Sequence, residues 1–372
     1  MKIKRFLLVG VSMTSLLLAG CGSSDSDEPD AAPVKANACK DATVNFIGLE
    51  GEEGKVELKE WRDERGMKLA SSWPGDWAQL IAAIKVGQPY ELSTIPYHWA
   101  QRMIAAKVVQ PIDISRLENW DKIAEGLRES PSLRGSDGKV YGVPIAWGDA
   151  PYVYAPDRVS TPPKSIEDLL DPSWKGRFVM FDAPDSPFHL LAKAHGFDKS
   201  PLLTPEQLDI VVADAKKLVK NAAAFQSNYQ DANDRLINKD VDLAIGGWEA
   251  QIAWAKKKGV TLDFGFFDEG RHGWWDGLAI PATSENVDCA YEYIDQMISA
   301  DVQADIATNL VSGAVNVDAF DKVEGEAKTY DYSVVTGGAN SDDFASSTPP
   351  EKVPDGYVNY QAWLDAWQKI KS

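Results

Sequence analysis

Short apolar runs alternate with amphipathic segments along most of the chain. Each run is bounded by turn residues, which is typical of β-strands. Strands are predicted over residues 42–49, 140–145, 241–245 and 278–280. Between these runs, apolar side chains recur every three or four positions, which is the spacing of one face of an α-helix. Helices are predicted over residues 55–65, 77–84, 205–219, 290–298 and 357–370. This alternation predicts an α/β fold.

Two of these helices have candidate start signals. Thr204 can cap a helix whose first position is Pro205, and Gln207 can complete a capping box. Ser284 is the predicted cap of the helix that carries Ala290. Residues 321–353 are polar and rich in Gly, Ser and Pro, which predicts an extended connection on the surface.

Length and charge narrow the class of protein. A chain of 372 residues favours two domains. Its 44% hydrophobic and 25% charged residues exclude global disorder and a protein with several membrane spans. The formal net charge of −18 makes the chain a poor binder of nucleic acid, so no nucleic-acid partner is expected. The acidity suits a cationic ligand, and it also favours solubility.

The N-terminus resembles a bacterial lipoprotein signal. Basic residues precede an apolar run over 6–18, and Leu-Ala-Gly-Cys follows at 18–21. The resemblance implies that residues 1–20 are removed and that Cys21 is lipidated, which anchors an extracytoplasmic protein to the membrane. The alternative is an ordinary secretory peptide with an incidental cysteine. Residues 21–38, after the cut, are small, acidic and Pro-rich and predict a flexible tether.

Cys39 and Cys289 remain once Cys21 is assigned to lipidation. In an exported protein such a pair indicates one disulfide, and two free thiols are the alternative.

Recognisable catalytic and metal-binding motifs are absent from the sequence. The sequence has no nucleophile elbow, zinc-binding H-E-x-x-H, phosphate-binding loop or dinucleotide fingerprint. His189 and His195 are six residues apart, which does not place both on one helix face as metal ligands. We therefore predict no enzyme activity, no cofactor and no metal.

Tryptophan is the unusual component, with 13 residues. Several lie next to an acid or a glycine, including Trp77 beside Asp76 and Trp274 near Asp276. Aromatic faces combined with carboxylates bind cations, at about 0.5–2 kcal/mol per face. Stacking on a sugar and packing in the core are the alternatives.

Four segments together, in their order and spacing, resemble the bacterial extracellular solute-binding proteins of ABC importers, in particular the spermidine/putrescine-binding branch. They are residues 141–148, 172–177, 241–245 and 273–281. The resemblance implies a two-lobed, type II periplasmic-binding-protein fold. Each lobe is then a mostly parallel sheet flanked by helices, with the ligand cleft between the lobes. Lobe 1 is predicted over 40–146 plus 277–320, and lobe 2 over 147–276 plus 350–372. Both Cys39 and Cys289 then fall in lobe 1, which favours the disulfide.

The resemblance also implies a set of ligand-binding residues. Asp276 corresponds to the family's amine-pairing aspartate and Trp274 to its stacking tryptophan. The first pocket loop corresponds to a stretch with Glu50 and Glu52, where the family's aromatic residues are missing. The other candidates are Trp77, His98, Trp99, Asp182, Asp185, Ser186, Trp248 and Ser312.

The acidic candidates decide which cation is expected. The family's lobe-two acids correspond to Ala183 and Ser186, and only a shift by one residue brings Asp182 and Asp185 into their place. If those two point away, a single carboxylate suits a monoamine or quaternary ammonium better than a polyamine. Glu50 and Glu52 are a possible second anchor for a diamine.

The predicted function is that of a monomeric, lipid-anchored binding protein. It captures a small organic cation, a polyamine or related amine, and delivers it to an ABC permease and its ATPase without catalysis. The alternatives are a sensory receptor subunit on the same scaffold, a binding protein for a neutral ligand such as a sugar, and an extracytoplasmic enzyme.

Overall fold

The computed structural model describes residues 37–226, 228–337, 348–349 and 352–371. They all belong to one compact unit, Pro33–Ser372. The predicted signal peptide, Cys21 and nearly all of the predicted tether lie outside the described residues. Among the helices that are described, none has both the length and the apolar character that a membrane span requires.

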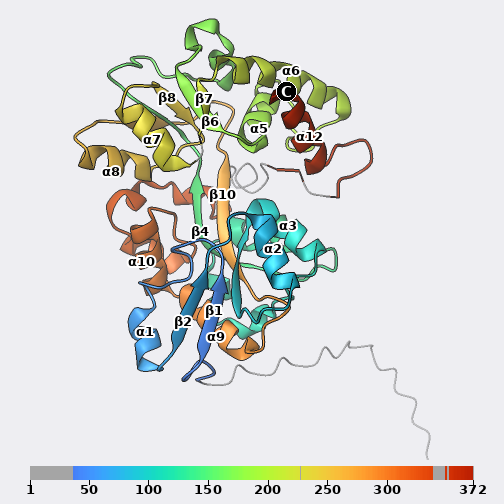
Figure 1. Ribbon diagram of the computed structural model, residues 1–372, viewed down its shortest axis with the longest axis vertical. Helices are drawn as coiled ribbons and strands as arrows, with labels where there is room; N and C mark the ends of the chain where they lie inside the picture. The colour runs from blue at the N-terminus through green and yellow to red at the C-terminus, as the bar shows by residue number, and fades with distance from the viewer. Residues whose placement is uncertain (1–36, 227, 338–347, 350–351, 372) are drawn as a thin grey trace, which may run out of the picture. The chain divides into compact units, whose positions relative to one another are not determined.

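The described chain forms two five-stranded sheets flanked by helices (Figure 1). The first has the strand order β2-β1-β3-β10-β4. Its strands are β1 Thr43–Ile47, β2 Lys68–Ser72, β3 Leu92–Pro96, β4 Val143–Asp149 and β10 Gly273–Ala279. Strand β1 pairs in parallel with β2 and β3, whereas β10 lies antiparallel between β3 and β4. All strands of this sheet except β10 therefore run in the same direction.

The second sheet repeats this plan with the order β7-β6-β8-β5-β9. Its strands are β5 Tyr152–Tyr154, β6 Phe178–Phe181, β7 Ala224–Gln226, β8 Leu243–Ile245 and β9 Asp263–Gly265. Here β5 is the reversed strand, because β6 is parallel to β7 and β8 while β5 is antiparallel to β8 and β9. The α/β fold with two mostly parallel sheets is confirmed.

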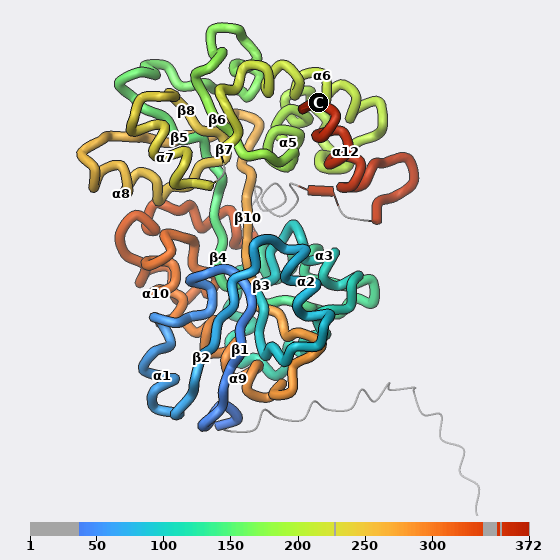
Figure 2. The backbone as a smooth tube through the Cα atoms, viewed as in Figure 1, coloured from blue at the N-terminus to red at the C-terminus, as the bar shows by residue number. Residues whose placement is uncertain are grey.

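Strands β4 and β10 carry the chain between the sheets (Figure 2). Strand β4 ends three residues before β5 begins, and β10 follows β9 across a short loop. The two strands pair along their length, from Gly273 opposite Asp149 to Leu278 opposite Val143. The lobe boundaries at 146/147 and 276/277 fall inside these strands and stay a prediction.

Helices cover both sheets. Near the first sheet in the chain are α1 Lys59–Glu64, α2 Trp77–Lys85, α3 Tyr97–Ala105, α4 Glu125–Arg128, α9 Val287–Met297 and α10 Ala300–Leu310. The others are α5 Asp185–Ala194, α6 Pro205–Asn221, α7 Tyr229–Ile237, α8 Ala250–Lys257 and α12 Tyr360–Lys371. Short 3₁₀ helices cover Ile114–Arg116, Trp120–Lys122, Pro131–Leu133, Ile166–Leu170, Pro172–Trp174, Val317–Lys322, Gly325–Thr329 and Tyr332–Val334.

Each sheet has its own hydrophobic core. The first core includes Trp147, Trp275 and the Cys39–Cys289 pair, which forms the disulfide that the sequence favours. In the second core, Trp363 and Trp367 of the terminal helix α12 pack against Phe188 of α5, and Trp367 also packs against Phe225 of β7.

Local signals predicted α6 well, and failed elsewhere. Thr204 caps α6 and forms the capping box with Gln207, as expected. Ser284 does not cap α9, which begins at Val287 after Asn286. The prediction of a surface connection over 321–353 is wrong for its described first part. There Val323, Ala327 and other apolar side chains are buried in the first core, because scattered apolar residues suffice to anchor irregular chain.

Candidate ligand-binding site

A cavity of about 750 Å³ lies where the strands of both sheets end. The loop after β1, helices α2 and α3, and strand β10 supply one part of its lining. The ends of β6, β7 and β8, with the residues that follow them, supply another. Ligand sites in α/β sheets form at the carboxyl ends of strands, where side chains of several loops converge. The topology therefore makes this cavity the candidate binding site.

Two carboxyl groups, Glu52 and Asp276, meet in the cavity. Glu52 is buried, and its Oε2 accepts a hydrogen bond from Thr94 Oγ1 at 2.7 Å. Burial, and then the charge of Asp276, raise the pKa of Glu52 well above its usual value. Burial also raises the pKa of Asp276 to about 6, against the lowering effect of a hydrogen bond with Glu52. At neutral pH Glu52 therefore holds the proton and donates to Asp276, so that the pair carries one negative charge.

Strand geometry aims Asp276 and Trp274 at the cavity. Alternate side chains of a strand face opposite sides, so Trp274 and Asp276 share one face. Trp275, on the other face, is buried, and its Nε1 donates to Ser130 Oγ at 3.3 Å. A β-bulge follows Asp276, where the register with β4 shifts before Gly277.

Gly48 lets the loop that carries Glu52 approach β3. A Cβ atom at this position would lie 2.1 Å from Thr94 Oγ1. A side chain there would displace Thr94, which also accepts a hydrogen bond from the Leu49 backbone amide at 3.1 Å. The hydrogen bond that holds Glu52 therefore depends on glycine at position 48.

Aromatic rings form the walls of the cavity. Trp77 meets His98 edge-on with ring centroids 6.1 Å apart. On the side of the second sheet, Tyr229 packs against Phe181 at 5.2 Å and Trp248 at 5.3 Å. The indole of Trp248 is fixed by a hydrogen bond from its Nε1 to the Val311 carbonyl oxygen at 2.8 Å. These ring faces provide the negative potential that attracts organic cations.

The cavity lacks a positive charge among its described lining residues, none of which is Lys or Arg. Its two histidines are neutral, because burial lowers the pKa of His98 to about 4 and that of His272 to about 3. His272 Nε2 lies 3.2 Å from the Tyr97 hydroxyl. With an ionised carboxylate and no opposing cation in this set, the lining favours a positively charged ligand.

Several buried polar atoms of the lining have no hydrogen-bond partner among the described residues. They are Ser186 Oγ, both polar side-chain atoms of Gln226, Trp274 Nε1, Ser312 Oγ, and Nδ1 of His98 and His272. An unsatisfied buried polar atom costs about 1–3 kcal/mol. A ligand with hydrogen-bonding groups, or bound water, would therefore be stabilised at these positions.

The two aspartates on the side of the second sheet already have partners. Lys371 Nζ contacts Asp182 Oδ1 at 2.6 Å and Oδ2 at 2.9 Å, and Trp367 Nε1 donates to the same Oδ1 at 2.7 Å. Asp185 accepts a hydrogen bond from the Tyr360 hydroxyl. Burial raises the pKa of Asp185 to about 6, whereas this bond and the charge of Arg102 lower it.

The structure brings most of the predicted site residues together. Those that line the cavity are Glu50, Glu52, Trp77, His98, Asp182, Asp185, Ser186, Trp248, Trp274, Asp276 and Ser312. Glu50 is exposed to solvent. The structure does not bring Trp99 to this group, since the residue lies outside the lining, with the Arg102 guanidinium 4.9 Å from its ring centroid. Each helical residue turns the chain by about 100°, so Trp99 points away from the side that Tyr97 and His98 present.

Sequence reasoning missed five polar or aromatic lining residues. They are Tyr97, Phe181, Gln226, Tyr229 and His272. Tyr97 begins the helix after β3, and Gln226 ends β7. The signal that could have found these two is their place at the end of a strand, where sites form.

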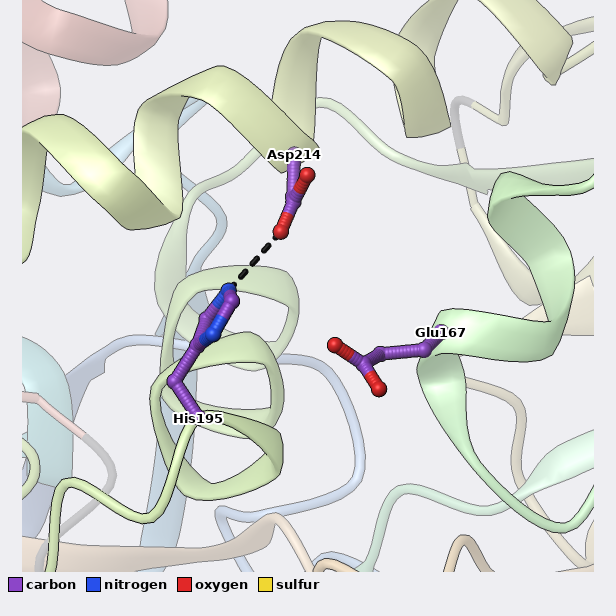
Figure 3. Close-up of side chains that lie close together, drawn as sticks. All are labelled: Glu167, His195 and Asp214. Atoms are coloured by element: carbon purple, nitrogen blue, oxygen red, sulfur yellow. Dashed lines mark hydrogen bonds and ion pairs between the residues drawn. The ribbon is translucent and has the colours of Figure 1, made fainter.

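Glu167, His195 and Asp214 lie close together (Figure 3). None of them lines the cavity. Their donor atoms lie within 4.8 Å of one another, a spacing that could hold a metal ion. His195 Nε2 contacts Asp214 Oδ2 at 2.8 Å, but Lys217 Nζ already contacts Asp214 Oδ1 at 2.7 Å. The lysine supplies the positive charge that a metal would bring, so we interpret the cluster as an ion-pair network.

An aromatic cavity lined by carboxyl groups, set where two α/β sheets meet, defines a protein that binds a small solute. Residues 67–330 match the family described as bacterial extracellular solute-binding protein. Because this match covers more than half of the chain, the chain belongs to that family, whose members bind solutes and are not enzymes.

Two comparisons give proteins to which the chain is similar. The spermidine/putrescine-binding periplasmic protein of Escherichia coli strain K12 is 27% identical over 199 residues, 53% of this chain and 55% of that protein. The chain thus matches about half the length of this relative. The spermidine/putrescine ABC transporter substrate-binding protein of Streptococcus pneumoniae has a similar fold, with a TM-score of 0.73 at 18% identity. This similarity covers 89% of this chain and 97% of the other.

The fold is shared by binding proteins of different specificity. A periplasmic binding protein of Agrobacterium tumefaciens B6, solved with glucopine, is similar with a TM-score of 0.66 at 15% identity, over 89% of this chain and all of the other. Fold similarity therefore leaves the ligand to be argued from the side chains of the cavity.

Proposed function

We propose that this protein captures a small organic cation, a polyamine or related amine, and delivers it to an ABC permease and its ATPase without chemical change. The observation that carries the proposal is the Glu52–Asp276 pair, which presents one negative charge inside an aromatic cavity. A buried ammonium needs such a counter-charge, because an unpaired buried ion is costly. The spermidine/putrescine-binding relative supports an amine as the ligand class.

We propose further that the protein is an extracytoplasmic, monomeric lipoprotein anchored through Cys21. The Cys39–Cys289 disulfide supports this location, because such bonds persist in oxidising compartments. Growth in the presence of labelled palmitate, with a Cys21→Ser variant as control, tests the anchor. Label in the native protein and none in the variant is expected, and equal labelling of both would contradict it.

A thermal-shift panel tests the ligand class. It contains putrescine, spermidine, n-butylamine, choline, betaine, amino acids and simple sugars, each at high excess. A ligand that binds only the folded protein stabilises it by RT ln(1 + [L]/Kd), about 4 kcal/mol at a thousandfold excess over Kd. We expect shifts with amines or quaternary ammonium compounds. A shift with sugars alone would replace the cation proposal with the neutral-ligand one.

A sensory receptor would bind the same ligand in the same cavity, so binding alone does not test delivery. Uptake of labelled ligand by cells that express the protein with its genomic permease does. Uptake that is unchanged when the binding protein is deleted would contradict a role in transport.

A further inference from the structure

We infer that the binding site accepts a single positive charge, and that Lys371 excludes the second ammonium of a diamine by occupying Asp182. The inference rests on the proposed function and narrows it to a singly charged organic cation, a primary amine or a quaternary ammonium compound. The geometry behind it is the position of the terminal helix α12, whose Trp367 and Lys371 contact Asp182 and whose Tyr360 contacts Asp185.

Lys371 occupies the position at Asp182 that a ligand ammonium would otherwise take. Its Nζ contacts both carboxylate oxygens of Asp182, at 2.6 and 2.9 Å, and the Trp367 indole adds a hydrogen bond to Oδ1. The Lys371 side chain is 20% exposed and that of Asp182 is 46% exposed, so water partly screens this ion pair. A ligand ammonium at Asp182 would have to displace Lys371, or would lie beside its like charge.

Asp185 is held by a hydrogen bond and not, among the described residues, by a direct ion pair. Its carboxylate accepts the Tyr360 hydroxyl, and the charge of Arg102 acts on it. The Arg102 guanidinium itself lies over the Tyr360 ring, 5.5 Å from the centroid. In the ligand-free protein, side chains of α12 therefore already contact both aspartates, and the charge of Arg102 from α3 acts on Asp185.

What remains for the ligand is the Glu52–Asp276 pair, which holds one negative charge and one shared proton. Glu50, the other lining acid, is exposed to solvent, where an ion pair contributes little. A second ammonium inside the cavity would meet Asp182 already paired with Lys371, and Asp185 already bonded to the Tyr360 hydroxyl and within the field of Arg102. The hydration that this ammonium loses would be only partly replaced, which weakens the binding of a diamine relative to a monoamine of the same length.

The matched ligands n-butylamine and putrescine test this charge count, because they share a four-carbon chain and differ by one ammonium. Titration calorimetry at pH 7.5 and 0.15 M salt gives both affinities for the native protein and for Lys371→Met. Methionine keeps an apolar stem of similar length and removes the charge. We expect the native protein to bind n-butylamine at least about tenfold more tightly than putrescine.

Lys371→Met should strengthen putrescine binding by up to about fivefold, because it frees the half-exposed Asp182 and removes a repelling charge. The double variant Lys371→Met/Asp182→Asn should lose that gain. Lys257→Met removes an equally positive charge from the exposed end of α8 and should leave both affinities unchanged. Melting temperatures confirm that each variant is folded.

Each outcome decides the question. Putrescine bound by the native protein as tightly as n-butylamine, or an affinity ratio that Lys371→Met does not change, would overturn the inference while leaving the cation proposal in place. If neither these amines nor choline bind the native protein, the proposed function fails, and the inference fails with it.

Discussion

Replacing each of the two carboxyl groups of the site by an amide should change the affinity for an amine ligand by very different amounts. Asp276→Asn removes the negative charge, whereas Glu52→Gln keeps it, because Glu52 is the protonated partner. The glutamine amide can still donate to Asp276, and its oxygen can still accept from Thr94 Oγ1, which lies 2.7 Å from Glu52 Oε2. The charge count therefore predicts a large effect for one variant and a small effect for the other.

The magnitudes follow from what each variant leaves buried. Asp276→Asn leaves the buried ammonium of the ligand without a counter-charge. This loss weakens the binding free energy by about 2–5 kcal/mol, or roughly 30-fold or more in Kd. Glu52→Gln exchanges one neutral donor for another, and its cost should stay below about 1 kcal/mol, or roughly fivefold in Kd. Titration calorimetry with n-butylamine at pH 7.5 measures both.

Asp276→Asn should lower the affinity for the amine but raise the stability of the ligand-free protein. Burial raises the pKa of Asp276 from 3.8 to about 6. Since a tenfold change in acidity corresponds to about 1.4 kcal/mol, the ionised carboxylate destabilises the ligand-free fold by roughly 3 kcal/mol at pH 7. The variant should therefore melt at a higher temperature while binding the amine poorly. Equal losses of affinity in both variants, or a greater loss in Glu52→Gln, would refute the assignment of the proton to Glu52.

Three further perturbations test other parts of the account. Lowering the pH from 7 to 5 protonates Asp276 and should weaken amine binding about tenfold in calorimetry. Because the pKa of this acid is raised in the fold, its protonation should make the ligand-free protein about 1 kcal/mol more stable at pH 5 than at pH 7. An affinity that rises as the pH falls would contradict this. Trp274→Leu removes a ring face and should weaken binding roughly 2- to 30-fold, so an unchanged Kd would exclude cation stacking on Trp274. Replacing Cys39 and Cys289 by Ser should lower the free energy of unfolding by about 2–5 kcal/mol in urea melts without changing Kd, because neither residue lines the cavity; a loss of affinity in folded protein would contradict that separation.

Local patterns predicted those parts of the fold that depend on neighbouring residues. The capping box of α6 joins Thr204 to Gln207, three positions apart, so the sequence alone contains it. Trp274 and Asp276 share a face because strand side chains alternate, and their separation by two residues is visible in the sequence. The surface connection failed as a prediction because the burial of Val323 and Ala327 depends on a core that the local composition does not reveal.

The charge balance of the site could not be predicted in the same way. Trp367 is 185 residues from Asp182, and Lys371 is 189 residues from it, so only the packing of α12 brings them together. Tyr229 and His272 reach the cavity from α7 and from the residue before β10, and nothing in their neighbours marks them. Trp99 lies outside the lining although its neighbour His98 belongs to it, since adjacent helical residues need not face the same side.

A crystal structure of the protein with n-butylamine tests the central claim most directly. The account predicts the amine nitrogen within about 2.7–3.2 Å of an Asp276 carboxylate oxygen, with the alkyl chain among the rings of the cavity and with Lys371 still paired to Asp182. An amine nitrogen at Asp182 or Asp185, with Lys371 displaced and Asp276 bonded only to Glu52, would contradict it.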